Sequence, residues 1–230
     1  MCNHMNSEGK NREENKKRAT AKGISSYAGY ATPNIIPSVS EWRGAEGEFT
    51  LNEHSRIVVD ANYQHELADK AQAFQSDLHD LSGQSFSVVT AMSPSPGDIF
   101  LSLGAENAAL GNEGYTIDIG DAVVISANQA TGTFFGTRSI LQMLQVDSEN
   151  KQIGKGFITD YPQWENRGLL LDVGRMFMPI TFLRDMVKQM SYFKMNDLQI
   201  HISDNAMSFD SEKWLEAQAG FDWRARPIPV

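Results

Sequence analysis

The stretch "GLLLDVGRMFMP", residues 168–179, decides how the second half of this sequence folds. Its opening apolar run lacks the alternation of a half-exposed strand, which predicts a strand buried on both faces. A helix is predicted over 182–194 behind Thr181, a suitable N-cap, from the apolar stripe Phe182, Leu183, Met186, Val187, Met190 and Phe193. "DLQIHIS", residues 197–203, predicts a second strand. Residues 168–203 are therefore expected to form one βαβ unit with two parallel strands.

Charged and polar side chains stand where both predicted strands end. Asp172 and Arg175 follow the first strand, and His201, Ser203 and Asp204 follow the second. Chemistry in parallel α/β folds is placed beyond the carboxyl ends of the strands. An arginine fork beside a carboxylate suits the vicinal hydroxyls of a sugar. Two structural alternatives stay open: Asp172 and Arg175 could form a local ion pair, and His201 could be a core histidine.

The preceding residues, 33–160, predict an α+β domain. Strands are expected within 48–60 and at 85–91, 98–104, 114–120, 122–128 and 152–162, with a hairpin turn at Gly120-Asp121. One helix is predicted from the spacing of Leu67, Ala71, Phe74, Leu78 and Leu81, ending at Gly83. A second helix is predicted at 131–145. We expect an antiparallel sheet with both helices on one face.

Composition narrows the classes of partner. The 230 residues are 41% hydrophobic, carry a net charge of -9 and have no basic patch, so neither nucleic acid nor an anionic membrane is an expected partner. No apolar run is long enough for a membrane span. Residues 1–32, including the lone Cys2, predict a disordered leader without the apolar core of a signal peptide. No phosphate loop, nucleophile elbow or metal-spaced histidines occur, and no cofactor or metal is expected.

Ordered motifs after residue 161 resemble a known family. The sequence supplies Arg167-Gly168, Asp172-Val-Gly-Arg175, Lys194-Met195-Asn196 and His201-Ile-Ser-Asp204. This series resembles the start of the catalytic barrel of family 20 glycoside hydrolases, the β-N-acetylhexosaminidases and lacto-N-biosidases. The resemblance implies a smaller domain at 33–160 and the first β-α-β unit of an incomplete TIM (β/α)8 barrel at 161–230.

The same resemblance implies roles and a substrate. Arg175 and Asp204 would bind the hydroxyls of a terminal N-acetylhexosamine, with Asp172 and His201 supporting them. Glycans containing that sugar would be the partners, no cofactor is implied, and the compartment would be secreted, periplasmic or cell-surface. The family's reaction uses the 2-acetamido oxygen of the substrate as nucleophile, oriented by an Asp and assisted by a neighbouring Glu acid, an exception to the two-carboxylate scheme.

Departures from the family pattern shape the expectation. Met176 and Asn205 stand where family members commonly have His and a second Asp, so the sugar specificity stays open. No Asp-Glu dipeptide occurs, and the residues after Tyr161 fall short of the about 250 that a whole barrel needs. A truncated, inactive enzyme portion that could self-associate through its open barrel edge is expected. The alternatives are a non-catalytic carbohydrate-binding or interaction module and a small unrelated α/β enzyme.

Overall fold

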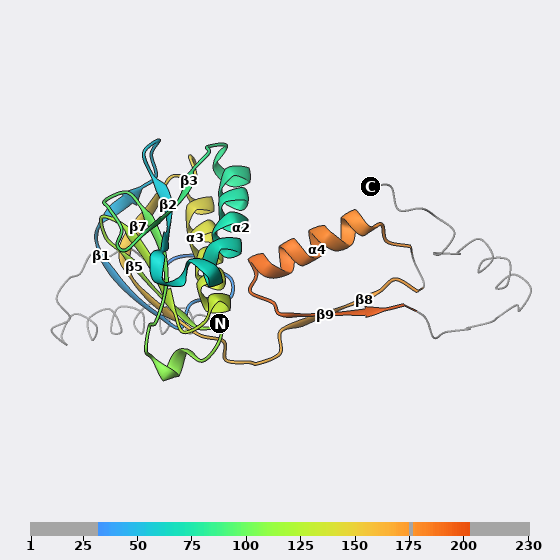
Figure 1. The fold of residues 1–230 in the computed structure, drawn as a ribbon. Coiled ribbons are helices and arrows are strands. Elements are labelled where there is room, and N and C mark those ends of the chain that lie inside the picture. The colour runs from blue at the N-terminus through green and yellow to red at the C-terminus, as the bar shows by residue number, and fades with distance from the viewer. Residues whose placement is uncertain (1–31, 175–176, 203–230) are drawn as a thin grey trace, which may run out of the picture. The chain divides into compact units, whose positions relative to one another are not determined.

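The computed structural model describes residues 32–174 and 177–202, drawn in colour in Figure 1. Contacts divide the chain into two units. The first holds the residues up to Glu165 together with Ser191–Lys194, and the second holds Asn166–Met190 and the residues from Met195 onward. The leader, expected to be disordered, lies outside the described residues.

A seven-stranded sheet forms the first unit, in the order β1-β7-β5-β6-β4-β2-β3. The strands β1, β7, β5 and β6 are antiparallel neighbours, whereas β6, β4, β2 and β3 run parallel. The sheet is thus mixed, and the expectation of an antiparallel sheet was wrong. The strands are β1 (Glu41–Thr50), β2 (Arg56–Asp60), β3 (Ser87–Ala91), β4 (Ile99–Leu103), β5 (Tyr115–Ile119), β6 (Val123–Ala127) and β7 (Gln152–Asp160).

Two connections explain why half of the sheet is parallel. The helix α2 (Gln64–Ser82) carries the chain from β2 back to the start of β3. The short loop 92–98 then returns the chain to the start of β4, where Arg56 of β2 forms an ion pair of 2.7 Å with Asp98. Connections this short usually join antiparallel strands, which misled the sequence prediction. The predicted hairpin between β5 and β6 is confirmed, with the Gly120 N–H donating to the Ala122 carbonyl.

Both long helices cover the same face of this sheet, as predicted. Figure 1 shows α2 beside α3 (Ala130–Val146), and the buried Arg138 of α3 forms an ion pair with Asp77 of α2. The predicted stripe of α2 is buried at Leu67, Ala71, Phe74 and Leu78. Helix α3 lies close to the sheet because Gly136 leaves room: a Cβ there would be 2.5 Å from Ile125 Cγ2. The short 3-10 helices η1 (Ala61–Tyr63) and η2 (Ala108–Leu110) complete this unit.

The second unit contains the predicted βαβ arrangement. Strands β8 (Gly168–Asp172) and β9 (Asp197–His201) are parallel, and α4 (Ile180–Tyr192) connects them. The sequence predicted Thr181 as the N-cap of this helix, but in the structure Thr181 lies inside the helix. The helix starts at Ile180, two residues earlier than predicted, because the Pro179 carbonyl accepts a hydrogen bond from the Leu183 N–H. Among the described residues, no helix is long and apolar enough to cross a membrane.

Strand β8 is less buried than its sequence predicted. Leu170 is 56% exposed, and Ile200 of β9 is 39% exposed. Helix α4 also exposes apolar side chains, among them Phe182 and Val187. The reason is that the described part of this sheet has two strands, whereas an apolar parallel strand is usually covered on both faces.

Candidate active site

Asp172 and His201 lie opposite each other at the carboxyl ends of β8 and β9. They are direct partners in the register of the two strands. The backbone N–H groups of Val173 and Gly174 both donate to the His201 carbonyl, at 3.0 and 3.2 Å. The Gly174 N–H also donates to Asp172 Oδ1 at 3.0 Å. The Asp172 carboxylate therefore shapes the chain just beyond the strand, as an aspartate commonly does at a turn.

Gly174 is needed for a close approach between two backbones. A Cβ at this position would lie 2.7 Å from the Ile202 carbonyl oxygen and 3.1 Å from its carbon. A side chain there would collide with backbone atoms, which cannot rotate away. The glycine in the Asp172-Val-Gly-Arg175 motif thus keeps the chain after β8 against the chain after β9.

Two further motif residues align the starts of the same strands. The Arg167 N–H donates to Asn196 Oδ1 at 2.9 Å, and the Asn196 N–H donates to the Arg167 carbonyl at 3.0 Å. This reciprocal pair joins the residues just before β8 and β9. It sets the register that brings Asp172 and His201 together at the opposite end.

Half of the predicted site is within the described residues. Asp172 and His201 are brought together as the strand order predicted, and both are half-buried, so His201 is not a fully buried core histidine. Arg175 and Asp204 lie outside the described residues. In the sequence, Arg175 follows Gly174 directly, and Asp204 is separated from Ile202 by Ser203.

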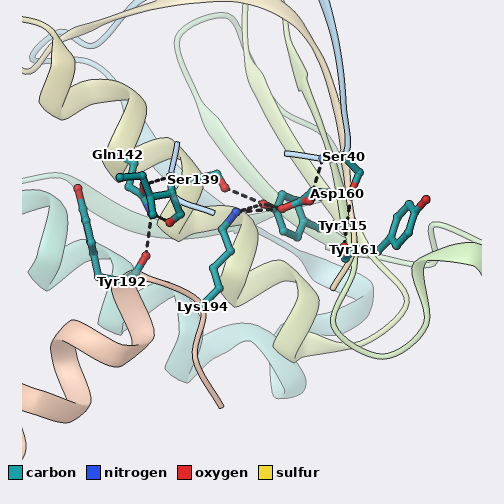
Figure 2. Close-up of polar contacts among 9 residues, drawn as sticks. Ser40, Tyr115, Ser139, Gln142, Asp160, Tyr161, Tyr192 and Lys194 are labelled. Atoms are coloured by element: carbon teal, nitrogen blue, oxygen red, sulfur yellow. Dashed lines mark hydrogen bonds and ion pairs between the residues drawn. The ribbon is translucent and has the colours of Figure 1, made fainter. Parts of the chain in front are cut away.

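Sequence reasoning missed the surroundings of Lys194. Its ammonium is buried in the first unit, 2.9 Å from Asp160 Oδ2 and 2.7 Å from the Tyr115 hydroxyl (Figure 2). Burial, and next the Asp160 carboxylate, raise the pKa of Tyr115 well above its ordinary value. No local pattern marks this cluster, because its members come from β5, β7 and the chain after α4. The described residues contain no group of three or more metal-ligating side chains.

Comparison with known proteins supports the motif resemblance. The family model of glycosyl hydrolase family 20, domain 2, matches residues 32–161, and that of the family's catalytic domain matches residues 164–212. The chain belongs to glycosyl hydrolase family 20. Its relatives include a lacto-N-biosidase of Bifidobacterium bifidum, 30% identical over 71% of this chain and 14% of that protein. A β-hexosaminidase of Porphyromonas gingivalis is 27% identical over 79% of this chain and 24% of its own length.

Solved structures of family 20 enzymes share this fold. The β-N-acetylhexosaminidase of Streptomyces coelicolor A3(2) matches with a TM-score of 0.63 at 25% identity, covering 76% of this chain and 36% of that one. A Streptomyces plicatus β-hexosaminidase in complex with its product GlcNAc matches with a TM-score of 0.65 at 22% identity, covering 78% and 36%. The chain thus carries a family 20 N-terminal portion and spans well under half the length of these relatives.

Proposed function

We propose that this family 20 chain is the front portion of a β-N-acetylhexosaminidase-type glycosidase. Its reaction would remove a terminal N-acetylhexosamine, or lacto-N-biose, from oligosaccharides or glycoconjugates by substrate-assisted retaining hydrolysis. The observation that carries this proposal is the pairing of Asp172 with His201 at the carboxyl ends of two parallel strands. Both of these residues belong to family motifs, and this end is where barrel enzymes keep their active sites.

In this proposal the chain has two parts with different roles. Residues 33–160 form the hexosaminidase-like N-terminal domain, and residues 161–230 begin a (β/α)8 catalytic barrel. The exposed apolar side chains of β8, β9 and α4 support the second assignment, since further barrel strands and helices would cover them. An open edge of this kind also provides a route to self-association.

The site residues divide into two that bind and two that support. Arg175 supplies a planar pair of N–H donors to the ring hydroxyls, and the Asp204 carboxylate accepts from a hydroxyl of the same sugar. Asp172 holds the Gly174 N–H and so sets where the chain leads into Arg175. The His201 carbonyl accepts from the same stretch of chain. Charge-assisted hydrogen bonds to sugar hydroxyls are the chemistry that this arrangement offers.

The catalytic Asp-Glu pair does not occur in these 230 residues. General acid catalysis is typically worth about 10² to 10⁴ in rate, so the chain by itself should not turn over substrate. We therefore separate two proteins in the test. One is the 230-residue chain, and the other is the extended protein, meaning this chain continued by the coding sequence that follows Val230.

The test measures hydrolysis of an aryl N-acetyl-β-glucosaminide by both proteins. We expect background rates from the 230-residue chain and turnover from an extended protein whose added sequence contains Asp-Glu. Turnover by the 230-residue chain that survives repurification and disappears in a point variant would overturn the assignment of catalysis to the missing pair. An extended protein with no Asp-Glu pair and no turnover would favour the alternative, a non-catalytic carbohydrate-binding or interaction module.

A further inference from the structure

Lys194 places a buried cation at a backbone position where glycine is favoured. Helix α4 ends with the Lys194 N–H donating to the Ser191 carbonyl and the Met195 N–H donating to the Met190 carbonyl. This is the Schellman arrangement, in which the residue before the last one adopts the left-handed conformation and is usually glycine. Lys194 adopts it with a φ of +58°. Because a lysine is strained in this conformation, we expect its side chain to make a stabilising interaction that a glycine could not make.

The contribution lies in the cluster that receives the ammonium. Lys194 is 6% exposed and donates to Asp160 Oδ2 and to the Tyr115 hydroxyl, which itself donates to the same carboxylate oxygen at 2.6 Å (Figure 2). The other carboxylate oxygen accepts from the N–H and hydroxyl of Ser40, both at 3.1 Å. The Ser139 hydroxyl is 2.6 Å from that of Tyr115. Among the described residues, Lys194 is thus the cation that forms an ion pair with this buried carboxylate.

The same short segment has a second attachment to the first unit. Gln142 of α3 donates from Nε2 to the Tyr192 carbonyl at 2.8 Å and to the Ile36 carbonyl at 3.0 Å. The Tyr192 hydroxyl donates to Gln145 Oε1. Residues 191–194, the anchor segment, therefore belong to the first unit, although the sequence on both sides of them belongs to the second.

We infer that Lys194 is a positioning residue whose buried ion pair makes the start of β9 depend on the folded core of the first unit. The chain leaves Lys194 through Met195 and reaches Asn196, whose amide donates to the Arg167 carbonyl ahead of β8. A released anchor segment would loosen the end of α4 and the start of β9 together. This inference concerns folding and is independent of the sugar chemistry proposed above.

Hydrogen exchange on the 230-residue chain tests it with three reporter amides, those of Lys194, Met195 and Asn196. Lys194→Met removes the ammonium, and Arg138→Met is the matched control, because Arg138 is also a buried cation paired with an aspartate of the first unit. We expect both variants to destabilise the unit by roughly 150-fold to 4000-fold in its unfolding equilibrium, as breaking a buried ion pair does. In Lys194→Met, but not in the control, the reporter amides should gain roughly tenfold more exchange than the amides of β4.

Two more variants separate the ammonium from the backbone. Lys194→Gly relieves the left-handed strain and should still expose the reporter amides; preserved protection would show that the helix cap alone suffices and would overturn the inference. Tyr115→Phe deletes one acceptor of the ammonium and serves if Lys194→Met does not fold. In Tyr115→Phe the exchange of the reporter amides should also rise relative to that of the β4 amides, but by a smaller factor than in Lys194→Met. Equal ratios of reporter to β4 exchange in the Lys194 or Tyr115 variant and in Arg138→Met would refute the positioning role.

Discussion

The close approach at Gly174 gives a direct prediction about how the candidate site is built. Gly174→Ala would put a Cβ 2.7 Å from the Ile202 carbonyl oxygen, far inside ordinary contact. Both neighbours are backbone, so the chain after β8 must move away from the chain after β9. That movement lengthens the hydrogen bond from the Gly174 N–H to the His201 carbonyl, which at 3.2 Å is already at the long end of the normal range.

The cost follows from two contributions. Overpacking of this kind typically costs about 1–3 kcal/mol. The loss of one backbone hydrogen bond adds about 1 kcal/mol. The local cost is therefore about 2–4 kcal/mol, which corresponds to a rise of roughly 30-fold to 1000-fold in the opening of this turn, at tenfold for every 1.4 kcal/mol.

Hydrogen exchange of the Val173 amide, which donates to the same carbonyl at 3.0 Å, measures that opening. The matched control is Gly168→Ala at the other end of β8, where the new Cβ would lie 3.4 Å from the Asp197 carbonyl oxygen, an ordinary contact. We expect Val173 exchange to rise strongly in Gly174→Ala and little in Gly168→Ala. Unchanged Val173 exchange in Gly174→Ala would show that the turn accommodates a side chain and that the glycine has another purpose.

Two further predictions concern the sugar site and the buried cluster. In the extended protein, Arg175→Lys keeps the charge but loses the two-pronged donor, and Asp204→Asn keeps the volume but loses the charge. Each variant should lower kcat/KM by an amount that corresponds to a loss of about 1–3 kcal/mol in transition-state binding, with little change in Tm. A large fall in Tm with kcat/KM preserved would instead support the local ion pair. Because burial and then Asp160 raise the pKa of Tyr115, its neutral phenol stabilises the fold fully below about pH 10 and loses that contribution as pH rises further. Urea unfolding at about pH 9 and about pH 11 should show a smaller loss of stability in Tyr115→Phe than in the unchanged chain, and equal losses would contradict this.

Elements with a complete local signal could be predicted from the sequence. The stripe of α2, its end at Gly83, and the hairpin between β5 and β6 all follow from residues that are close together in the chain. The βαβ unit was predictable for the same reason, since an apolar run, a helical stripe and a second strand follow in order. The pairing of Asp172 with His201 then follows from the parallel direction of the two strands.

Strand direction in the first unit could not be read in this way. The loop 92–98 crosses to the far side of β2, where Arg56 and Asp98, which are distant in sequence, form an ion pair. No local pattern in the sequence specifies that crossing. The burial of Lys194 is a similar case. Its place at the end of an amphipathic helix suggests a solvated charge, whereas hydrogen bonds to Asp160 and Tyr115, both distant in sequence, make a buried position tolerable.

Several residues of the family motifs have a structural role in the described part of the chain. Arg167 and Asn196 align two strand starts, Gly174 permits a close backbone approach, and Lys194 is buried away from solvent. These residues fix the course of the backbone, so a match to these motifs is first of all evidence for the fold. The chemical part of the proposal then depends on Arg175 and Asp204, which lie outside the described residues. That is why the kinetic comparison of Arg175→Lys and Asp204→Asn, and not a further sequence match, decides whether this end of the strands binds a sugar.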